Sequence, residues 1–393
     1  MKQKYELLAP AGDFSMLSTA VNAGANAVYF GLKEFSMRAS AKNFTINDLN
    51  KIEKICKPKN VQRYLTLNTI IYNNELKKLE QIIKKVKGKI NAIICWDFSV
   101  INLCKKYKIP FLISTQASVS NIESAKFYKK LGAKRIVLAR ELNLKQIKEI
   151  SKIIDIECFC HGAMCVAVSG RCFTSQFLFN KSANRGECLH PCRRSYIVRD
   201  DEGNKLKIEN SRIFSAKDLC TLPFIEKMKK AGIKSFKIEG RNRDARYVDA
   251  VVRIYRKALD KKLTQKEIQE GLNELEKIYN KGYSSGFYLK MPISDDFAKI
   301  EHNASQEKKH FVGKVKHYFD KVGVAAIKLV SELKVGDKIV IIGKTTGIVH
   351  SKIGSIEIKN KKIEKGKKDD EIGIKIQKVR KNDEVYLIKS IKN

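Results

Sequence analysis

Seven of the ten cysteines fall within residues 158–220, and this concentration of thiols is the strongest sign of chemistry in the chain. Thiolates gathered from separate loops can hold a zinc ion or an iron–sulfur cluster. Structural zinc sites more often use tight Cys-x-x-Cys pairs, and the sequence has none. The wide, uneven spacing therefore favours an iron–sulfur cluster. The seven residues are Cys158, Cys160, Cys165, Cys172, Cys188, Cys192 and Cys220.

Nucleophilic catalysis is a second interpretation of the same stretch. His161 stands four residues before Cys165, and a histidine base can activate a cysteine as the nucleophile of a peptidase. No third, orienting group is evident in the sequence, and the other cysteines would have no role. A third interpretation is that the cysteines are packing residues without any ligand.

The chain is strongly basic. Its formal net charge is +36 at pH 7, from 78 Lys and Arg against 42 Asp and Glu. Such an excess indicates an anionic partner, and RNA and DNA are the usual candidates. Solvated lysine-rich faces would give the same count, because the excess is spread along the chain. Charge alone does not identify which nucleic acid binds.

Short apolar runs alternate with longer amphipathic stretches through the first two thirds of the chain, and this pattern predicts parallel βαβ units. Eight strands within residues 1–300 predict an α/β fold, a (β/α)8 TIM-like barrel. The main alternative is a doubly wound sheet, but no Gly-x-Gly-x-x-Gly turn follows the first strand. The predicted strands are Glu6–Leu8, Ala27–Phe30, Arg63–Asn68, Ala92–Cys95, Phe111–Ser114, Arg135–Leu138, Ile156–Cys160 and Ser235–Ile238.

The sequence at the carboxyl ends of these strands is polar or rich in glycine. Examples are Thr-Gln-Ala-Ser at 115–118, Ala-Arg-Glu at 139–141 and Glu-Gly-Arg at 239–241. In a barrel, these ends form the rim at which catalytic groups gather. The pattern is what an active-site rim would need, although ordinary turns after strands also require polar residues.

From about residue 309 the pattern changes to short β-rich runs with turn signals such as Val-Gly-Asp at 335–337. Residues 309–393 are therefore predicted to form a small C-terminal antiparallel β-barrel domain. No apolar run reaches the roughly 18 residues of a membrane-spanning helix, and the N-terminus lacks the features of a signal peptide. We expect a cytoplasmic protein without membrane association, in which structural disulfides are disfavoured.

The segment 157–172 contains His-Gly-Ala-Met-Cys followed by Ser-Gly-Arg-Cys. It resembles the signature of the peptidase U32 family, the collagenase-like proteases. The segments 7–13, 184–188 and 237–241 are similar to other parts of that family, so the resemblance covers nearly the whole predicted barrel. Thr174, where the family usually has an aliphatic residue, is a minor departure.

The resemblance implies a function beyond the family's name. Its better understood members resemble RNA and quinone hydroxylation proteins that carry a 4Fe-4S cluster on four cysteines and work without molecular oxygen. The length and the C-terminal domain are most similar to the branch that hydroxylates the wobble uridine of tRNA to 5-hydroxyuridine, with prephenate as hydroxyl donor. The segment 333–339 also resembles the second domain of elongation factors, which contacts RNA in those proteins. A U32-type peptidase, or hydroxylation of another RNA, is the alternative.

The resemblance can be carried over to individual cysteines. Cys158 and Cys160 fall inside a predicted strand, and we expect them to be packing residues. Cys192 is an alternative to Cys188 as the third ligand. The ligands implied for the cluster are Cys165, Cys172, Cys188 and Cys220.

The strand ends supply candidates for binding and catalysis. Prephenate is a dianion, and cationic side chains at the rim could hold its carboxylates by charge-assisted hydrogen bonds. A surface salt bridge is the alternative role for each cation. We nominate His161, Glu239 and Arg241 as catalytic residues. The nominated substrate-binding residues are Arg140, Lys237 and Gln116.

Overall fold

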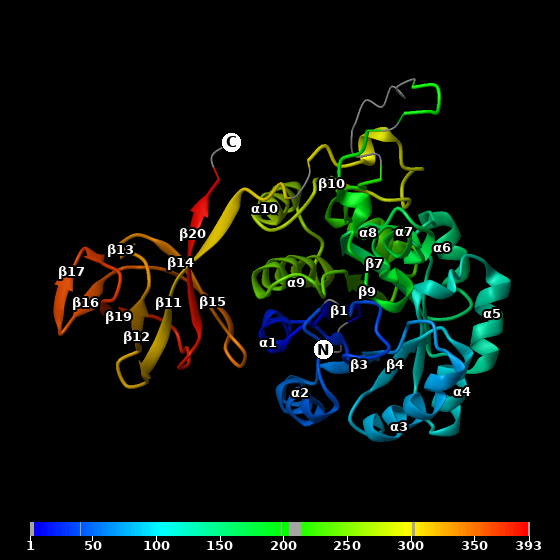
Figure 1. Cartoon of the computed structure of the whole chain (residues 1–393), viewed down its shortest axis with the longest axis horizontal. Coiled ribbons are helices and arrows are strands. Elements are labelled where there is room, and N and C mark those ends of the chain that lie inside the picture. The colour runs from blue at the N-terminus through cyan, green and yellow to red at the C-terminus, as the bar shows by residue number, and fades with distance from the viewer. Residues whose placement is uncertain (1–3, 40, 198, 204–213, 301–302, 392–393) are drawn as a thin grey trace.

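The structure is a computed structural model of the chain, and it describes residues 4–39, 41–197, 199–203, 214–300 and 303–391 (Figure 1). A barrel surrounded by helices occupies one side of the molecule, and a smaller β-domain formed by the C-terminal strands lies beside it.

Eight parallel strands close into a ring, which confirms the predicted (β/α)8 barrel. Neighbouring strands pair in parallel from β1 to β7, and β9 closes the ring by pairing with both β7 and β1. Because both faces of a parallel sheet are covered, its strands read as short apolar runs. The strands of the ring are β1 (Glu6–Pro10), β2 (Ala27–Gly31), β3 (Gln62–Thr66), β4 (Ala92–Cys95), β5 (Phe111–Ile113), β6 (Arg135–Val137), β7 (Ile156–Gly162) and β9 (Ser235–Ile238).

Helices surround the outer face of the ring, and the main hydrophobic core lies between them and the strands (Figure 1). Local sequence fixes where several of them begin. At the start of α1, the Asp13 carboxylate accepts a hydrogen bond from the Met16 N–H at 2.9 Å, and Thr264 and Glu267 cap α10 reciprocally. The helices are α1 (Phe14–Ala23), α2 (Leu49–Cys56), α3 (Leu76–Val86), α4 (Phe98–Lys106), α5 (Ile122–Leu131), α6 (Leu144–Ile150), α8 (Ile225–Lys230), α9 (Ala245–Asp260) and α10 (Gln265–Glu276).

Two short strands lie outside the ring. The strand β8 (Asp218–Cys220) runs antiparallel to β7, and β10 (Tyr283–Ser284) pairs with β8. In this register His161 lies opposite Cys220. The chain between β7 and β9 therefore makes a long excursion, which includes β8, before it returns to the ring.

Charged side chains fill one end of the barrel interior. The Glu157 carboxylate on β7 is completely buried and accepts hydrogen bonds from Lys237 Nζ at 2.9 Å and Arg135 Nη1 at 3.3 Å. Arg135 also pairs with Glu6 on β1, and the Ser235 hydroxyl donates to both carboxylates. Burial raises the pKa of Glu157, but Lys237 and Arg135 together outweigh it, so the carboxyl is ionised.

The C-terminal domain is antiparallel, as the sequence predicts, and has its own apolar core, which includes Val315, Ile327 and Ile341. Eight strands pair in the order β15-β14-β20-β11-β12-β19-β16-β17, without pairing between the two end strands among the described residues. The strands are β11 (Glu307–Phe319), β12 (Val324–Leu329), β14 (Lys338–Gly343), β15 (Gly347–Lys352), β16 (Ile356–Ile358), β17 (Lys361–Ile363), β19 (Glu371–Lys375) and β20 (Glu384–Ser390), with β13 (Leu333–Lys334) and β18 (Lys365–Gly366) forming a separate pair.

The β14–β15 hairpin packs this domain against α1 and α9 of the barrel. The Ser18 hydroxyl donates to the Lys344 carbonyl at 2.7 Å, and His350 Nε2 lies 3.0 Å from the Asp249 carboxylate. At the hairpin turn, Gly347 has a φ of +75°, and a Cβ there would lie 2.9 Å from a backbone nitrogen of α1. The contact therefore requires glycine, both for backbone conformation and for close approach.

The buried network predicts that loss of the Glu157 charge strongly destabilises the folded chain. Glu157→Gln is expected to lower the free energy of unfolding by about 3–5 kcal/mol, because it leaves the buried Lys237 ammonium without a counter-charge. Denaturant unfolding followed by circular dichroism measures the change. The matched control is Glu123→Gln, which removes an exposed ion pair with Lys126 and should leave the unfolding midpoint nearly unchanged. Equal midpoints for the two variants would contradict the role given to Glu157.

Candidate functional site

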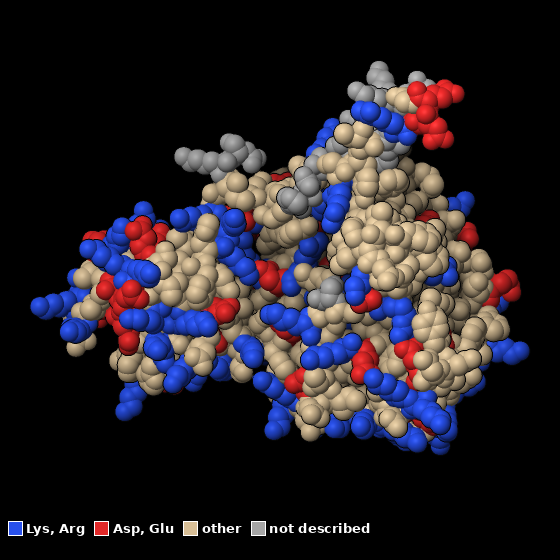
Figure 2. Space-filling view, in the orientation of Figure 1, with Lys and Arg blue, Asp and Glu red and all other residues tan. Residues whose placement is uncertain are grey.

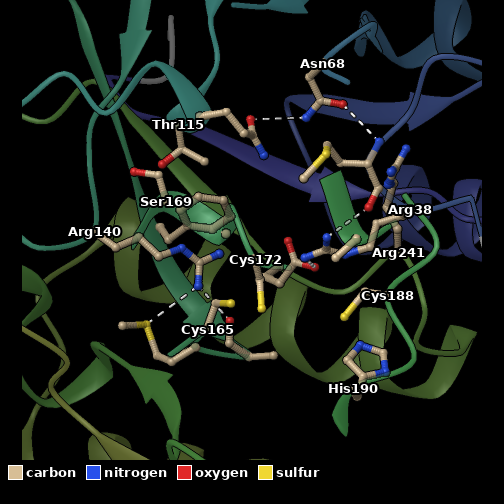
Figure 3. A pocket seen from close by; sticks show the side chains of 18 of the residues that line it. Arg38, Asn68, Thr115, Arg140, Cys165, Ser169, Cys172, Cys188, His190 and Arg241 are labelled. Carbon is tan, nitrogen blue, oxygen red and sulfur yellow. Dashed lines mark hydrogen bonds and ion pairs between the residues drawn. The ribbon is translucent and has the colours of Figure 1, made fainter. Parts of the chain in front are cut away.

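A cavity opens at the carboxyl ends of the barrel strands (Figure 3). Tyr29, Ile94 and Phe159 contribute side chains from inside the barrel to its lining, and the loops after the strands contribute the rest. The long excursion after β7 supplies the largest share of the loop residues. The cavity therefore occupies the rim position in which barrel enzymes carry their active sites.

Four cysteines line this cavity: Cys165, Cys172, Cys188 and Cys192. Cys165 follows β7, and Cys172 stands just before the short helix α7 (Thr174–Phe179). Cys188 lies in the loop before the 3-10 turn Pro191–Arg193, and Cys192 lies within that turn. Figure 3 shows the three thiols of Cys165, Cys172 and Cys188 directed into the same space. Burial raises the pKa of Cys192 to about 11, and the other three thiols raise it as well, so all four share one electrostatic environment.

Cys220 does not belong to this group. It lies on β8, is 4% exposed, and its Sγ is 3.7 Å from the Tyr255 hydroxyl of α9. Burial raises the pKa of its thiol to about 11. Because β8 lies outside the ring, Cys220 packs between the ring and α9 and is absent from the cavity lining. The structure therefore places Cys192 beside Cys165, Cys172 and Cys188 at the cavity and places Cys220 outside its lining, while the ligand set itself stays a prediction.

His161 is also turned away from the cavity, which corrects its nomination as a catalytic residue. The register of β7 against β9 shifts between Phe159 and His161, so the alternation that points Phe159 inward is broken. The His161 ring is buried among the rings of Tyr247, Tyr255 and Tyr283, with centroid separations of 5.5–5.9 Å. Burial lowers its pKa to about 3, so the imidazole is neutral at physiological pH.

Arginines surround the thiols (Figure 3). The guanidinium of Arg140 lies 3.7 Å from the centroid of the Phe159 ring and donates to the Ala163 carbonyl at 2.6 Å. Arg38 pairs with the Glu239 carboxylate at 3.3 Å. Glu239 is the main cause of the raised pKa of Arg38, and two of the cavity thiols add to it. Arg38 is therefore a permanent cation within electrostatic range of the cysteines.

Arg241 is the most unusual of these cations. It is 3% exposed, and its Nη1 donates to the hydroxyls of Ser36 at 2.7 Å and Thr66 at 3.0 Å. Among the described residues, no carboxylate lies within ion-pair distance of it. Burial lowers the pKa of Arg241 to about 10, which still leaves it charged at neutral pH. A buried guanidinium held only by neutral hydroxyls favours an anion in the cavity beside it.

The other nominated residues line the cavity but already have partners. Lys237 donates to Glu157 at 2.9 Å, so its charge is balanced within the barrel. Glu239 is occupied by Arg38, and the Gln116 amide oxygen accepts hydrogen bonds from neighbouring side chains. Arg140 and Arg241 are therefore the nominated cations best placed to meet a ligand.

Three further residues of the lining were not predicted: Arg38, His190 and Arg193. Arg38 stands seven residues beyond the end of β2. It is too far from the strand end for the sequence pattern to assign it to the rim of the barrel. The other two lie in Cys-Leu-His-Pro-Cys-Arg at 188–193, and their position beside two cysteines was a usable signal.

The donor set at the cavity bears on the kind of metal centre that it could hold. Within the described residues, no three His, Cys, Asp or Glu side chains lie close enough to hold a single metal ion. A tetrahedral zinc site would need such convergence, because all its ligands bind one ion at about 2.0–2.3 Å. A cluster of several irons binds each thiolate at a different metal atom. Four thiols around one cavity, with arginines to balance negative charge, are a donor set that an iron–sulfur cluster could use.

Fold and cavity together define a (β/α)8-barrel protein with a thiol-lined site at the carboxyl end of the barrel. The sequence matches the model of peptidase family U32 over residues 12–297. The chain therefore belongs to peptidase family U32, as its motifs predict.

Similar proteins carry different functional names. The chain is 42% identical to an uncharacterised protease of Methanocaldococcus jannaschii over 98% of both chains. It is 40% identical to a collagenase of Porphyromonas gingivalis over 97% of both chains. It is also 35% identical to tRNA hydroxylation protein P1 of Bacillus subtilis, over 87% of this chain and 84% of that one. Among the described residues, no helix has the length and apolar character needed to span a membrane.

The buried position of His161 predicts a pH dependence of stability. Its pKa is about 3 in the folded chain and near the ordinary value of 6.5 in the unfolded chain. The unfolded chain therefore binds more protons between these values, and stability falls as pH drops through this window. In His161→Gln, the free energy of unfolding should fall less between pH 7 and pH 4.5 than in the wild type. Urea titrations at both pH values measure this, with the exposed His310→Gln as control; identical acid sensitivity in all three proteins would refute it.

Proposed function

We propose that the chain is an oxygen-independent RNA hydroxylase that carries a 4Fe-4S cluster on Cys165, Cys172, Cys188 and Cys192. The observation that carries this proposal is the grouping of four thiols around one cavity that is also lined by buried and half-buried arginines. The name of the Bacillus subtilis relative supports tRNA as the RNA, and the net charge of +36 is consistent with a polyanionic substrate. We further propose that the wobble uridine is the target.

When bound, the cluster supplies the one-electron redox chemistry that side chains lack. The protein's own contribution is to hold the reactants beside it. A uridine taken out of the base stack can enter a cavity of this kind, as in other enzymes that modify bases. The aromatic residues Tyr29 and Phe159 in the lining offer apolar surface to such a base.

The hydroxyl donor in this proposal is a small dicarboxylate, for which prephenate is our candidate. Arg140 and Arg241 lie on different sides of the thiols (Figure 3). Among the described residues, the hydrogen bonds of Arg241 all use its Nη1, and a guanidinium has five N–H donors. One carboxylate at each arginine would fix a dianion across the cavity through charge-assisted hydrogen bonds.

A peptidase is the second candidate function, because two of the similar proteins are named as a protease and a collagenase. A cysteine peptidase needs a thiol and a base within hydrogen-bond reach. Among the described residues, no histidine is hydrogen-bonded to a cysteine, and His161 faces away from the cavity. These observations favour the hydroxylase.

The cluster can be tested by its ligand set. After anaerobic purification, the wild type is expected to contain about four iron atoms and matching acid-labile sulfide per chain. Cys192→Ser should lose most of this iron, because it removes one of the four thiols around the cavity. Cys220→Ser is the matched control and should keep it, since Cys220 packs against α9. Iron loss in Cys220→Ser but not in Cys192→Ser would instead support the ligand set implied by the family resemblance.

The reaction can be tested by nucleoside mass spectrometry. The chain is expressed in a bacterial strain that has been deleted for its own 5-hydroxyuridine pathways, and bulk tRNA is digested and analysed. We expect 5-hydroxyuridine derivatives with the wild type, and at least a tenfold lower level with Cys192→Ser. Removal of prephenate synthesis from the host should abolish the signal if this donor is used. Unmodified tRNA together with hydrolysis of a gelatin substrate by the purified protein would favour the peptidase.

A further inference from the structure

The helix α7 exposes apolar side chains at the mouth of the cavity. Phe177 is 82% exposed and Phe173 63% exposed, and their ring centroids lie 6.0 Å apart with an interplanar angle of 31°. Leu178 beside them is also exposed. Large apolar side chains that gather on a surface mark sites of interaction. We call the pair Phe173 and Phe177 the aromatic pair.

The aromatic pair is tied to the candidate site. Cys172 immediately precedes Phe173, and Thr174 and Ser175 of α7 line the cavity. The Cys172 N–H donates to the Asn184 side chain at 3.1 Å, and the Ser175 hydroxyl accepts from the Leu189 N–H at 3.1 Å. These bonds fix the helix to the loops that carry the other thiols. A molecule on the aromatic pair would therefore lie directly beside the cavity.

The surroundings of the aromatic pair are basic. Within residues 165–199 the only carboxylate side chain is that of Glu187, which lies 3.5 Å from Lys181, and an acidic run follows at 200–202. Arg194 lies over the Phe179 ring at 5.1 Å, and Arg171 donates to the Ser118 hydroxyl at 3.0 Å. Figure 2 shows an uncharged bulge in the region of α7 with basic side chains near its border. The basic residues of the segment are Arg171, Lys181, Arg185, Arg193, Arg194 and Arg199.

Exposed rings within a basic border match the chemistry of single-stranded nucleic acid. Bases have apolar faces that stack on aromatic side chains, and the phosphates between them need cations. Arg185 is already paired with Glu75, but Arg171 and Arg194 form no ion pair among the described residues, and such cations disfavour a basic protein partner. Duplex RNA hides its base faces and would leave the rings without a partner.

We propose that the aromatic pair is a stacking platform for unpaired RNA bases that flank the target nucleotide. This inference rests on the proposed function, since it assumes that RNA reaches the cavity. It adds that the substrate segment is single-stranded on at least one side of the target. Bases stacked on Phe173 and Phe177 would hold the neighbouring nucleotide at the mouth of the cavity, and Arg171 would contact the backbone.

The test measures RNA binding by fluorescence anisotropy with the full chain, purified anaerobically. One probe is a labelled 17-nucleotide hairpin with a seven-nucleotide uridine-containing loop, and the other is a fully paired duplex of equal length. Phe177→Ala is expected to weaken hairpin binding about tenfold, within the range for loss of one stacked base. Phe177→Trp should bind the hairpin about as well as the wild type, and neither substitution should change duplex binding. Arg171→Gln should reduce the salt dependence of hairpin binding by about one phosphate contact.

Phe127→Ala is the matched control, because Phe127 is 52% exposed on α5 in the outer helical layer. It should bind the hairpin like the wild type. Wild-type affinity in Phe177→Ala, or failure of Phe177→Trp to restore binding, would overturn the platform and leave the proposed function intact. A wild-type chain that binds neither probe would overturn both. Loss of a co-purifying protein in Phe177→Ala, with hairpin affinity unchanged, would assign the rings to a protein contact and overturn the platform.

Discussion

The buried carboxylate of Glu157 is the constraint on which the rest of the barrel depends. It sits inside the ring on β7 and holds Lys237 from β9 and Arg135 from β6, while Arg135 reaches Glu6 on β1. Charges so deeply buried tolerate little displacement, because each loses its partner if a strand shifts. Four strands at the closing side of the ring are thereby held in register. The cysteine-bearing excursion begins at the end of β7, and the segment with Glu239 and Arg241 follows β9. The fixed register of these two strands therefore also positions the residues of the site.

The charge and polarity of the side chains inside the barrel change along its axis. At one end the charges are balanced, and Lys237 is neutralised by Glu157. A layer of apolar side chains follows, including Tyr29 and Ile94. At the carboxyl end, the hydrogen-bond partners of Arg241 among the described residues are the hydroxyls of Ser36 and Thr66. The positive charge of Arg241 therefore lies where a ligand would enter the cavity.

Much of this arrangement could be predicted from sequence. The eight strands follow from short apolar runs, and their polar ends correctly placed Arg140, Lys237, Glu239 and Arg241 at the cavity. His161 could not be placed, because the register shift after Phe159 is a tertiary feature that the alternation of β7 does not reveal. The position of Cys220 also depends on a tertiary feature. Its segment is not among the predicted strands, and it forms β8, which pairs antiparallel with β7 outside the ring. Arg38 had no local signal, because it lies far along a loop.

All four thiols at the cavity lie within residues 165–192, a single excursion between two strands of the ring. The pairing of β7 with β9 and the core between strands and helices use none of them. If the proposed cluster binds these thiols, the barrel can close first and the cluster can be added afterwards to a folded scaffold. In many small metalloproteins metal binding and folding are one event. In this chain the thiols are confined to one excursion, so the barrel would stay folded without the proposed cluster and could take it up again.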